Sequence, residues 1–372
     1  MGGVPPLSRQ PSERSMSKRP SQAPRGRGAR SNPDNRYEAR SRVEVDDGWG
    51  SLDAEPPPLA TTLSVDTSRS VISYNQSPDV GFDRSINPYR GCEHGCVYCF
   101  ARPSHAWLGL SPGLDFESRL FYKPQAAALL RKELAAPNYR CAPIAVGINT
   151  DGYQPVERRL GITRAILDVL RECQHPLTII TKSWLVERDI DILAEMAGKG
   201  LVRVMVSVTT LDHPLARTLE PRASAPRRRV EIIRHLSEAG IPVGVMVAPL
   251  IPVLTDGELE TILADARAAG ARSAGYVLLR LPHEVKDLFR EWLAEHAPTQ
   301  AAHVMERIRD SRGGKDYAAQ FGERMRGTGI YADLIAQRFR LAHQRLGFES
   351  ASPLDTRRFR PPRIDTDQLT LF

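Results

Sequence analysis

Short apolar segments alternate with segments of helical periodicity between about Val80 and Pro282. The apolar segments predict β-strands, and the longer segments between them predict helices. Because a strand–helix–strand connection returns the chain in its first direction, this order predicts a parallel sheet. The predicted strands are Ser85–Tyr89, Ile144–Asn149, Leu177–Thr181, Val202–Val208, Val243–Ala248 and Ala274–Leu281, and the predicted helices lie near Pro124–Ala135, Val156–Glu172, Leu185–Lys199, Pro226–Ala239 and Asp256–Ala269.

Three glycines support the predicted helix ends. Gly200, Gly240 and Gly270 each stand where a C-terminal cap belongs, because glycine readily adopts the left-handed conformation that such a cap requires. We expect an α/β fold in which the sheet curls into part of a barrel. The chemistry of such a barrel gathers at the carboxyl ends of its strands.

Composition and pattern divide the chain into four parts. Residues 1–70 are rich in Ser, Pro, Gly and Arg and too poor in apolar residues to fold alone, which predicts a disordered basic tail. Residues 78–283 form the predicted barrel core, and the helical spacing of residues 284–348 predicts a C-terminal helical extension. Residues 349–372 return to Pro, Arg and Asp and predict a flexible tail.

The net charge of +7 has a local origin. Residues 1–43 hold ten basic and three acidic residues, so the rest of the chain is neutral overall. This excludes a uniformly basic surface around which DNA would wrap. The basic segment is interpreted as a solvated linker or, alternatively, as an arm that contacts phosphates. No apolar run approaches the roughly 20 residues of a membrane helix and no apolar signal segment is present, so we expect a cytoplasmic protein without a membrane partner.

Three of the five cysteines lie within eight positions. Cys92, Cys96 and Cys99 form a C-x3-C-x2-C motif on a glycine-containing loop directly after the first predicted strand. In a reducing compartment such spacing indicates metal binding or catalysis more than disulfides. Three thiolates can bind three irons of a [4Fe–4S] cluster and leave the fourth open to another ligand. The alternative is a structural zinc site with His94 or His105 as fourth ligand, and the lack of a second cysteine pair favours the cluster.

The motif resembles that of the radical S-adenosylmethionine (SAM) superfamily. The resemblance implies a partial (β/α)6 barrel and a [4Fe–4S] cluster whose open iron binds the amino and carboxylate groups of SAM. It further implies that an electron, from a reductant such as flavodoxin or ferredoxin, cleaves SAM to methionine and a 5′-deoxyadenosyl radical.

Further segments resemble the spore photoproduct lyase branch, the DNA-repair members of that superfamily. They are ITK at Ile180–Lys182, VMVSV at Val204–Val208, LEP at Leu219–Pro221 and GIPVGVMVAPLI at Gly240–Ile251. By this resemblance Lys182 and Ser207 contact SAM. An ammonium suits a carboxylate, and a hydroxyl can pair with a ribose or an amine. The alternative is that Lys182 caps a strand and Ser207 is a satisfied inner-barrel residue.

Two departures from the lyases concern the return of hydrogen to the substrate. The lyases use a Cys at the end of the second strand, where this chain has Asn149–Asp151. Cys141 lies before that strand, and Cys173 lies at the far end of the following helix. A Tyr that follows the third cluster cysteine in the lyases is Phe100 here, which has no phenolic hydrogen. Tyr98 does match the aromatic residue before that cysteine.

The segment NTDGYQPVER, Asn149–Arg158, follows the second strand and is a further candidate for the site. Asp151, Tyr153, Gln154 and Glu157 are expected to face the predicted cavity, where they would hold the SAM amine or orient a substrate. The alternative is a turn and helix start, with a proline near the first helical position.

Glu220 and Arg222 follow the fourth strand in a LEPRA segment. An acid and a guanidinium suit a ribose and a carboxylate. The predicted site residues are therefore Tyr98, Asp151 and Tyr153 for catalysis, Lys182, Ser207, Glu220 and Arg222 for SAM, and Cys92, Cys96 and Cys99 for the cluster.

The leading interpretation is an enzyme of radical SAM chemistry that acts on nucleic acid, in a lyase-like repair of DNA photoproducts. A second interpretation moves the same chemistry to an RNA or protein substrate. A third, from a different class, is a non-catalytic iron–sulfur or zinc protein that senses or scaffolds at DNA. Cleavage of SAM on reduction separates the first two from the third.

The sequence ends in QLTLF, Gln368–Phe372. QLxLF closely resembles the peptide by which bacterial replication and repair proteins bind the sliding clamp. Leu371 and Phe372 would fill an apolar pocket, Leu369 matches the motif, and Gln368 would supply a directional hydrogen bond. The alternative is a terminal strand or an apolar tail folded back onto the body.

Clamp binding is tested with a fluorescent peptide that covers Ile364–Phe372. Burial of each apolar anchor is worth about 1.5–3 kcal/mol. Replacement of Leu371 and Phe372 by alanine is therefore expected to weaken binding about a hundredfold or more, since ~1.4 kcal/mol is tenfold. Deletion of Gln368–Phe372 from the full chain is expected to leave the iron content unchanged. A dissociation constant of about 100 μM corresponds to a binding free energy of ~5.5 kcal/mol. If the peptide shows no binding at about 100 μM clamp, the match to the clamp motif is a coincidence.

Overall fold

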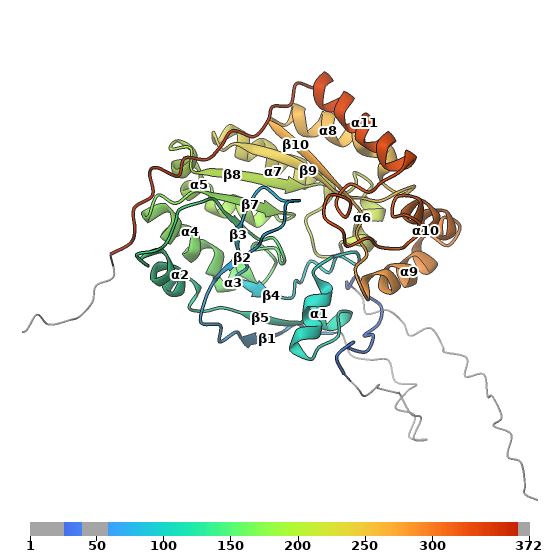
Figure 1. Ribbon diagram of the computed structural model, residues 1–372, viewed down its shortest axis with the longest axis horizontal. Helices are drawn as coiled ribbons and strands as arrows, with labels where there is room; N and C mark the ends of the chain where they lie inside the picture. Colours follow the sequence, from blue (N-terminus) through green and yellow to red (C-terminus); the bar gives the residue numbers. More distant parts are fainter. Residues whose placement is uncertain (1–25, 39–58, 364–372) are drawn as a thin grey trace, which may run out of the picture.

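A seven-stranded sheet is the central element of the protein (Figure 1). The computed structural model describes residues 26–38 and 59–363. The strand order is β10–β9–β8–β7–β6–β3–β2, in which neighbouring strands are parallel except that β2 is antiparallel to β3. Because β10 and β2 are the two edges, the sheet forms a partial barrel that is open along one side. The α/β class and the parallel sheet predicted from the sequence are confirmed.

The strands are β1 (Thr62–Val65), β2 (Ile72–Tyr74), β3 (Arg84–Ile86), β4 (Tyr89–Arg90), β5 (Arg119–Tyr122), β6 (Ile144–Val146), β7 (Leu177–Thr181), β8 (Val202–Ser207), β9 (Val243–Leu250) and β10 (Ser273–Leu278). The α-helices are α1 (Leu114–Ser118), α2 (Ala126–Leu134), α3 (Glu157–Leu160), α4 (Ile162–Glu172), α5 (Ile190–Ala197), α6 (His213–Leu219), α7 (Pro226–Glu238), α8 (Leu259–Ala268), α9 (Val285–His296), α10 (Ala301–Asp310) and α11 (Ile330–Arg345). The 3-10 helices are η1 (Arg102–Leu108), η2 (Trp184–Asp189) and η3 (Asp256–Glu258).

The two faces of the sheet differ in chemistry. Successive side chains of a strand point to opposite faces, and the outward set is large and apolar, as in Ile179, Val204 and Val245, which are buried against the helices. The inward set includes Thr178 and Met205, which line a cavity within the barrel. The concave side of the sheet therefore surrounds space, whereas the convex side forms the packed core.

The predicted helix ends are confirmed by backbone conformation. Gly200, Gly240 and Gly270 follow α5, α7 and α8 with φ angles of 69°, 75° and 101°. One predicted helix, Val156–Glu172, is divided into α3 and α4 at Gly161, which has a φ of 65°. The helices predicted after the barrel are present as α9, α10 and α11.

A second sheet, in the order β1–β5–β4, lies beside the barrel (Figure 1). β1 is parallel to β5, and β4 is antiparallel to it. The apolar pattern did not predict these strands, because they are short and partly exposed. The prediction of a disordered tail over residues 1–70 is therefore wrong for β1, and it is also wrong for residues 26–38, which pack against the protein body.

Residues 349–363 likewise differ from the predicted flexible tail. The backbone N–H of Asp355 donates to the carbonyl of Gly200 at 3.0 Å, and that of Arg360 donates to the carbonyl of Cys173 at 2.8 Å. These backbone hydrogen bonds hold the segment along the amino ends of the parallel strands. Gln368–Phe372 lie outside the described residues, so clamp binding stays a prediction. No helix within the described ranges is both long and apolar enough to cross a bilayer.

Candidate functional site

The three clustered cysteines lie on the segment that connects β4 to η1, at the carboxyl ends of the parallel strands. Cys92 and Cys96 are buried, and Cys99 is half-buried. The N–H of Cys92 donates to the carbonyl of Phe116 at 2.9 Å, and the N–H of Val97 donates to the carbonyl of Leu219 at 3.1 Å. The loop is therefore fixed to α1 on one side and to the end of α6 on the other.

A buried ion pair supports this loop from within. Arg102 is fully buried, and its guanidinium donates to the carbonyls of Cys96 at 2.8 Å and Gly95 at 3.2 Å. The same guanidinium pairs with the carboxylate of Glu117, which is also fully buried. Because both charges are paired and hydrogen-bonded, they can stay inside the protein and fix the backbone on which Cys96 lies.

Gln154 holds the loop on the other side of Cys92. Its side-chain oxygen accepts a hydrogen bond from the N–H of Glu93 at 2.8 Å, and its amide nitrogen donates to the carbonyl of Gly91 at 3.1 Å. Gly91 has a φ of 78°, and a Cβ at this position would lie 2.6 Å from a methyl group of Leu120. The fully buried side-chain amide of Gln154 thus forms hydrogen bonds with the backbone on both sides of Cys92.

Residues 26–38, here called the N-terminal strap, pack directly on the cysteine loop. The N–H groups of Gly28 and Ala29 donate to the two carboxylate oxygens of Glu117 at 2.9 and 2.7 Å. A Cβ on Gly28 would lie 1.7 Å from the carbonyl oxygen of Gly95, so only glycine fits there. The strap therefore forms one wall of the site, although the sequence predicts a disordered tail.

The strap continues to the helical extension. Arg30 forms an ion pair with Glu295 of α9, and Arg36 forms one with Glu284 at 2.8 Å. Arg27 is buried and donates to the carbonyl of Glu117 at 2.7 Å. The side chains of these three arginines contact other residues of the protein. They therefore do not belong to a free arm that contacts phosphates.

The chemistry of the three thiols fits an iron–sulfur cluster. Burial raises the pKa of Cys92 and of Cys96 well above the usual range, and burial also raises the pKa of Cys99. A metal ion that binds a thiol displaces the thiol's proton. Because burial disfavours a free, reactive thiolate, this environment favours thiolates that are bound to a metal.

A single zinc ion fits less well. In the part of the chain that the structure describes, no three His, Cys, Asp or Glu side chains surround one point as ligands of one ion would. Cysteines of a cubane each bind a different iron, so the cluster does not require that arrangement. Nδ1 of His94 lies 3.4 Å from Asp151, and Nε2 of His105 lies 3.0 Å from the carbonyl of Arg119. Both histidines thus have partners that a zinc ion would have to replace.

Lys182 lies directly after β7 and points toward the cysteine loop. Its ammonium donates to the hydroxyl of Thr209 at 3.0 Å and to the carbonyl of Ala248 at 2.9 Å, and it lies 3.2 Å from a carboxylate oxygen of Glu220. Burial, and then the positive charge of Arg229, lower the pKa of Lys182 to about 7. The ends of β7, β8 and β9 thus bring one ammonium beside the thiols.

Tyr98 and Glu220 belong to the same cluster of side chains. The hydroxyl of Tyr98 donates to Glu220 and lies 3.2 Å from the hydroxyl of Thr209. Glu220 also pairs with the guanidinium of buried Arg229. This set of contacts makes Glu220 the counterion that positions Lys182 and Tyr98. Arg222, in contrast, pairs with Glu93 at 3.1 Å at the edge of the strap.

Asp151 joins the barrel to the cysteine loop. It accepts hydrogen bonds from the hydroxyl of Thr181 at 2.8 Å and from the N–H of Lys182 at 2.8 Å, and it faces His94. Ser207 ends β8 and is buried, and its carbonyl accepts from Arg229 at 3.3 Å. The structure therefore brings Asp151 and Ser207 to the predicted end of the barrel.

Tyr153 and Glu157 do not face the cavity, and their prediction as site residues is corrected. Tyr153 is buried in the apolar core of the barrel, where burial raises the pKa of its phenol well above the usual range. Glu157 accepts from the hydroxyl of Tyr89 and pairs with Arg188 at 2.7 Å. Both residues have the structural role that a turn and helix start implies.

The other two cysteines lie at the opposite ends of the strands. Cys141 precedes β6, and Cys173 caps the end of α4 just before β7. The cysteine loop follows the carboxyl ends of these strands, so the two groups of thiols are separated by the length of the sheet. Sequence reasoning missed Arg102, Glu117 and Gly28, because their roles arise from contacts between distant segments.

Comparison with known proteins places this geometry in context. A model of the Radical SAM superfamily matches residues 86–266. The chain is 39% identical over 230 residues to the uncharacterized protein Rv2578c of Mycobacterium tuberculosis, a match that covers 61% of this chain and 68% of that protein. It is 28% identical over 182 residues to the uncharacterized protein MJ0683 of Methanocaldococcus jannaschii, covering 49% of this chain and 65% of that protein.

Solved structures show the same fold. Spore photoproduct lyase complexed with dinucleoside spore photoproduct has a TM-score of 0.54 and 14% identity, and the match covers 77% of this chain and 80% of that one. A variant of that lyase with bound AdoMet and the same dinucleoside has a TM-score of 0.54 and 13% identity over the same shares of the two chains.

Removal of single thiols tests the metal centre. We expect anaerobically reconstituted protein to contain four irons and four sulfides, the content of one [4Fe–4S] cluster, and Cys92→Ala, Cys96→Ala or Cys99→Ala to abolish this content. Cys141→Ala and Cys173→Ala are the controls and are expected to retain it, because they lie at the other end of the strands. Stoichiometric zinc without iron would contradict the assignment.

The strap makes a second prediction. Gly28→Ala places a methyl group against the loop carbonyl and is expected to cost on the order of 1–3 kcal/mol of stability, seen as a lower melting temperature and faster loss of iron to a chelator. Gly257→Ala, where a Cβ meets nothing within 4 Å, is the matched control. Equal iron loss in the two variants would show that the strap does not support the loop.

Proposed function

Since the chain belongs to the radical SAM superfamily, we propose that it uses radical chemistry on nucleic acid, in a DNA repair reaction of the photoproduct lyase type. The observation that carries this proposal is the position of three clustered thiols, two buried and one half-buried, beside Lys182 at the carboxyl ends of the strands of a partial barrel. The cofactors of the superfamily are a [4Fe–4S] cluster and SAM.

Cys92, Cys96 and Cys99 would hold three irons of the cluster. When bound, the cluster supplies the electron that cleaves SAM to methionine and a 5′-deoxyadenosyl radical. We assign the electron to a reductant such as flavodoxin or ferredoxin. A reducing cytoplasm, as predicted from the sequence, suits an iron–sulfur centre of this kind.

The chain's own residues provide the contacts for SAM. We assign the SAM carboxylate to Lys182, whose ammonium lies at the carboxyl ends of the strands beside the thiols. Glu220 and Thr209 hold that ammonium in place, so they are positioning residues. Ser207, at the end of the neighbouring strand, is assigned a polar contact to the remainder of SAM. Arg222 is engaged with Glu93 and is assigned to the wall of the site.

Hydrogen return differs from that of the lyases in this proposal. Asn149, not a cysteine, follows β6 at the site, and Cys141 precedes this strand. Tyr98 lies between Cys96 and Cys99 in the sequence, and its phenol donates to Glu220. We therefore assign no thiol to hydrogen return and propose that the phenol of Tyr98 gives a hydrogen atom to the product radical, and that one electron from the reductant and one proton then restore the phenol.

Nucleic acid as the substrate is supported by the likeness of this fold to a lyase that is complexed with a dinucleoside photoproduct. β10 and β2 are the two edge strands of the sheet, and within the described residues they do not pair with each other. A substrate strand can then lie outside the barrel while a single damaged site enters it.

The proposal is tested with reconstituted, reduced protein, SAM and ultraviolet-damaged DNA. We expect 5′-deoxyadenosine to form faster with damaged DNA than with undamaged DNA, and the photoproduct to disappear. Cys141→Ala is expected to turn over like the unaltered protein, because its side chain lies away from the site. If RNA or a protein accelerates SAM cleavage and damaged DNA does not, the DNA assignment is wrong. If Cys141→Ala cleaves SAM but accumulates an unfinished adduct, this thiol is the hydrogen donor.

A further inference from the structure

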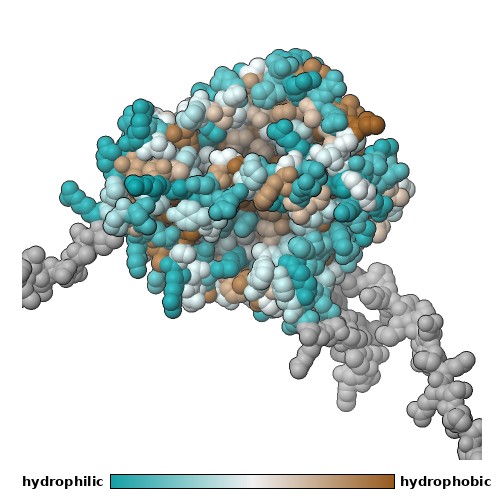
Figure 2. Space-filling view, viewed as in Figure 1, coloured by the Kyte–Doolittle hydropathy of each residue, from teal (hydrophilic) through white to brown (hydrophobic). Residues whose placement is uncertain are grey.

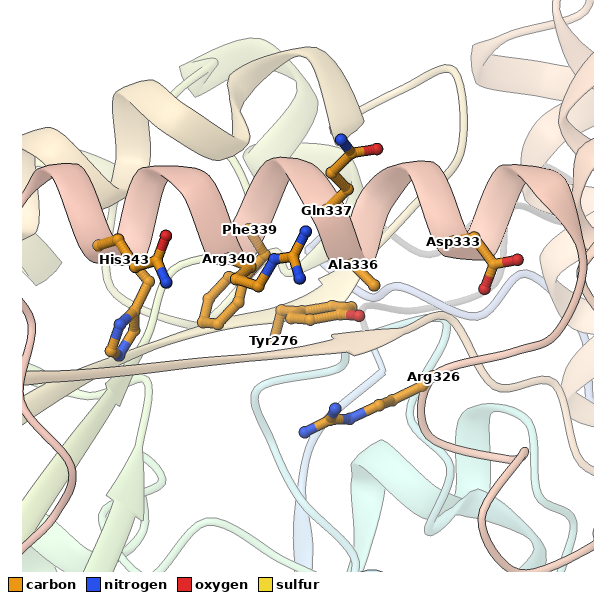
Figure 3. A pocket seen from close by; sticks show the side chains of 9 residues that line it. Tyr276, Arg326, Asp333, Ala336, Gln337, Phe339, Arg340 and His343 are labelled. Carbon is orange, nitrogen blue, oxygen red and sulfur yellow. The ribbon is translucent and has the colours of Figure 1, made fainter.

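A surface groove of about 710 Å³ follows the open edge of β10 (Figure 3). It lies between β10 and α11, and Arg326 reaches into it from the segment before α11. Figure 3 shows the guanidinium groups of Arg340 and Arg326 on either side of the ring of Tyr276. The space-filling view, taken from the same side as Figure 1, shows polar and apolar side chains mixed over the face of the molecule that it displays (Figure 2).

Two arginines of the groove have no acidic partner among the described residues. Across residues 26–38 and 59–363, neither the side chain of Arg326 nor that of Arg340 forms a hydrogen bond or an ion pair, and Asp333 is the one acid among the groove's lining residues. Arg338, which lies on α11 as Arg340 does, pairs with Glu260 at 2.7 Å. Its charge is therefore already neutralised within the protein. The groove therefore offers more positive charge than negative, and within the described residues neither guanidinium is paired with an acid.

Arg326 stands on a fixed segment of backbone. The N–H of Leu278, at the end of β10, donates to the carbonyl of Met325 at 2.9 Å. Arg312 is buried and donates to the carbonyl of Glu323 at 2.7 Å and to that of Leu279 at 2.9 Å. The backbone that carries Arg326 is thus fixed beside the edge strand β10.

The wall of the groove is aromatic. The rings of Tyr276 and Phe339 have centroids 4.8 Å apart. Tyr276 is 9% exposed, and its hydroxyl has no hydrogen-bond partner among the described residues. Guanidinium groups bind phosphates, and aromatic rings stack on bases. A buried hydroxyl without a partner can form a hydrogen bond with a phosphate or a sugar.

A second cavity shares one lining residue with the groove. His343 lines the groove and lines this second cavity of about 440 Å³, whose other walls include Thr178, Met205 and Arg203 on the concave face of the sheet. This volume lies within the range of small-molecule sites, about 300–1,000 Å³. A strand that lies in the groove therefore runs along β10, the edge strand of the sheet.

We propose that this groove binds the phosphodiester backbone of a nucleic acid strand, with Arg326 and Arg340 as its phosphate contacts. The inference rests on the proposed function and adds the place at which the nucleic acid docks. The basic charge needed for docking is thus local, which agrees with the neutral composition of the chain outside its first 43 residues.

The test compares full-length Arg326→Ala/Arg340→Ala with the unaltered protein in a titration of a fluorescent single-stranded oligonucleotide at several salt concentrations. Each lost phosphate contact lowers the slope of log affinity against log salt by about 0.7 for single strands, so we expect a slope smaller by about 1.4 and binding weaker by about tenfold or more at low salt. Arg227→Ala/Arg234→Ala, which removes two exposed arginines of α7, is the matched control and is expected to bind like the unaltered protein.

The outcomes separate the two proposals. If the unaltered protein binds and the groove variant binds equally well, with the same iron content and circular dichroism, the groove is not the docking site and the proposed function stands. If the two double variants lose affinity equally, binding depends on total charge and the groove assignment is wrong. If the unaltered protein binds no nucleic acid, both the groove and the nucleic acid substrate are wrong.

Discussion

The buried ion pair between Arg102 and Glu117 is the contact on which the candidate site depends. Its guanidinium holds the carbonyls of Gly95 and Cys96, and its carboxylate accepts from the backbone of the N-terminal strap. Removing one partner of a buried pair typically costs about 3–5 kcal/mol, because the other charge is left unpaired. Such a pair can therefore fix a loop that contains little regular structure of its own.

Three distant parts of the chain support the loop that carries the three cysteines. The strap lies on the cysteine loop and pairs with α9, so the helical extension is connected to the site through Arg30 and Arg36. Gln154, from the loop after β6, fixes the other side of the first cysteine. These contacts order the loop that carries the thiols, and an ordered loop lowers the ordering cost of assembling a metal centre.

Periodicity predicted the parts of the fold that repeat. β7 agrees with its predicted bounds, and the three glycine caps are confirmed, because buried strands and helix ends carry local signals. The cysteine spacing likewise identified the centre of the site. The strap has no apolar pattern and is held by backbone N–H groups and close packing at Gly28, so composition gave the opposite prediction. Tyr153 shows the same limit, since its position in the core depends on how the chain turns after β6.

The central claim is that the three-cysteine loop holds a cluster with one iron open to SAM. Electron paramagnetic resonance of the anaerobic, reduced protein, recorded with and without SAM, tests it most directly. We predict the signal of a reduced [4Fe–4S] cluster and a change in that signal when SAM is added, because a new ligand on the open iron alters its environment. A cluster signal that SAM leaves unchanged, or zinc-filled protein without a signal, would contradict this account.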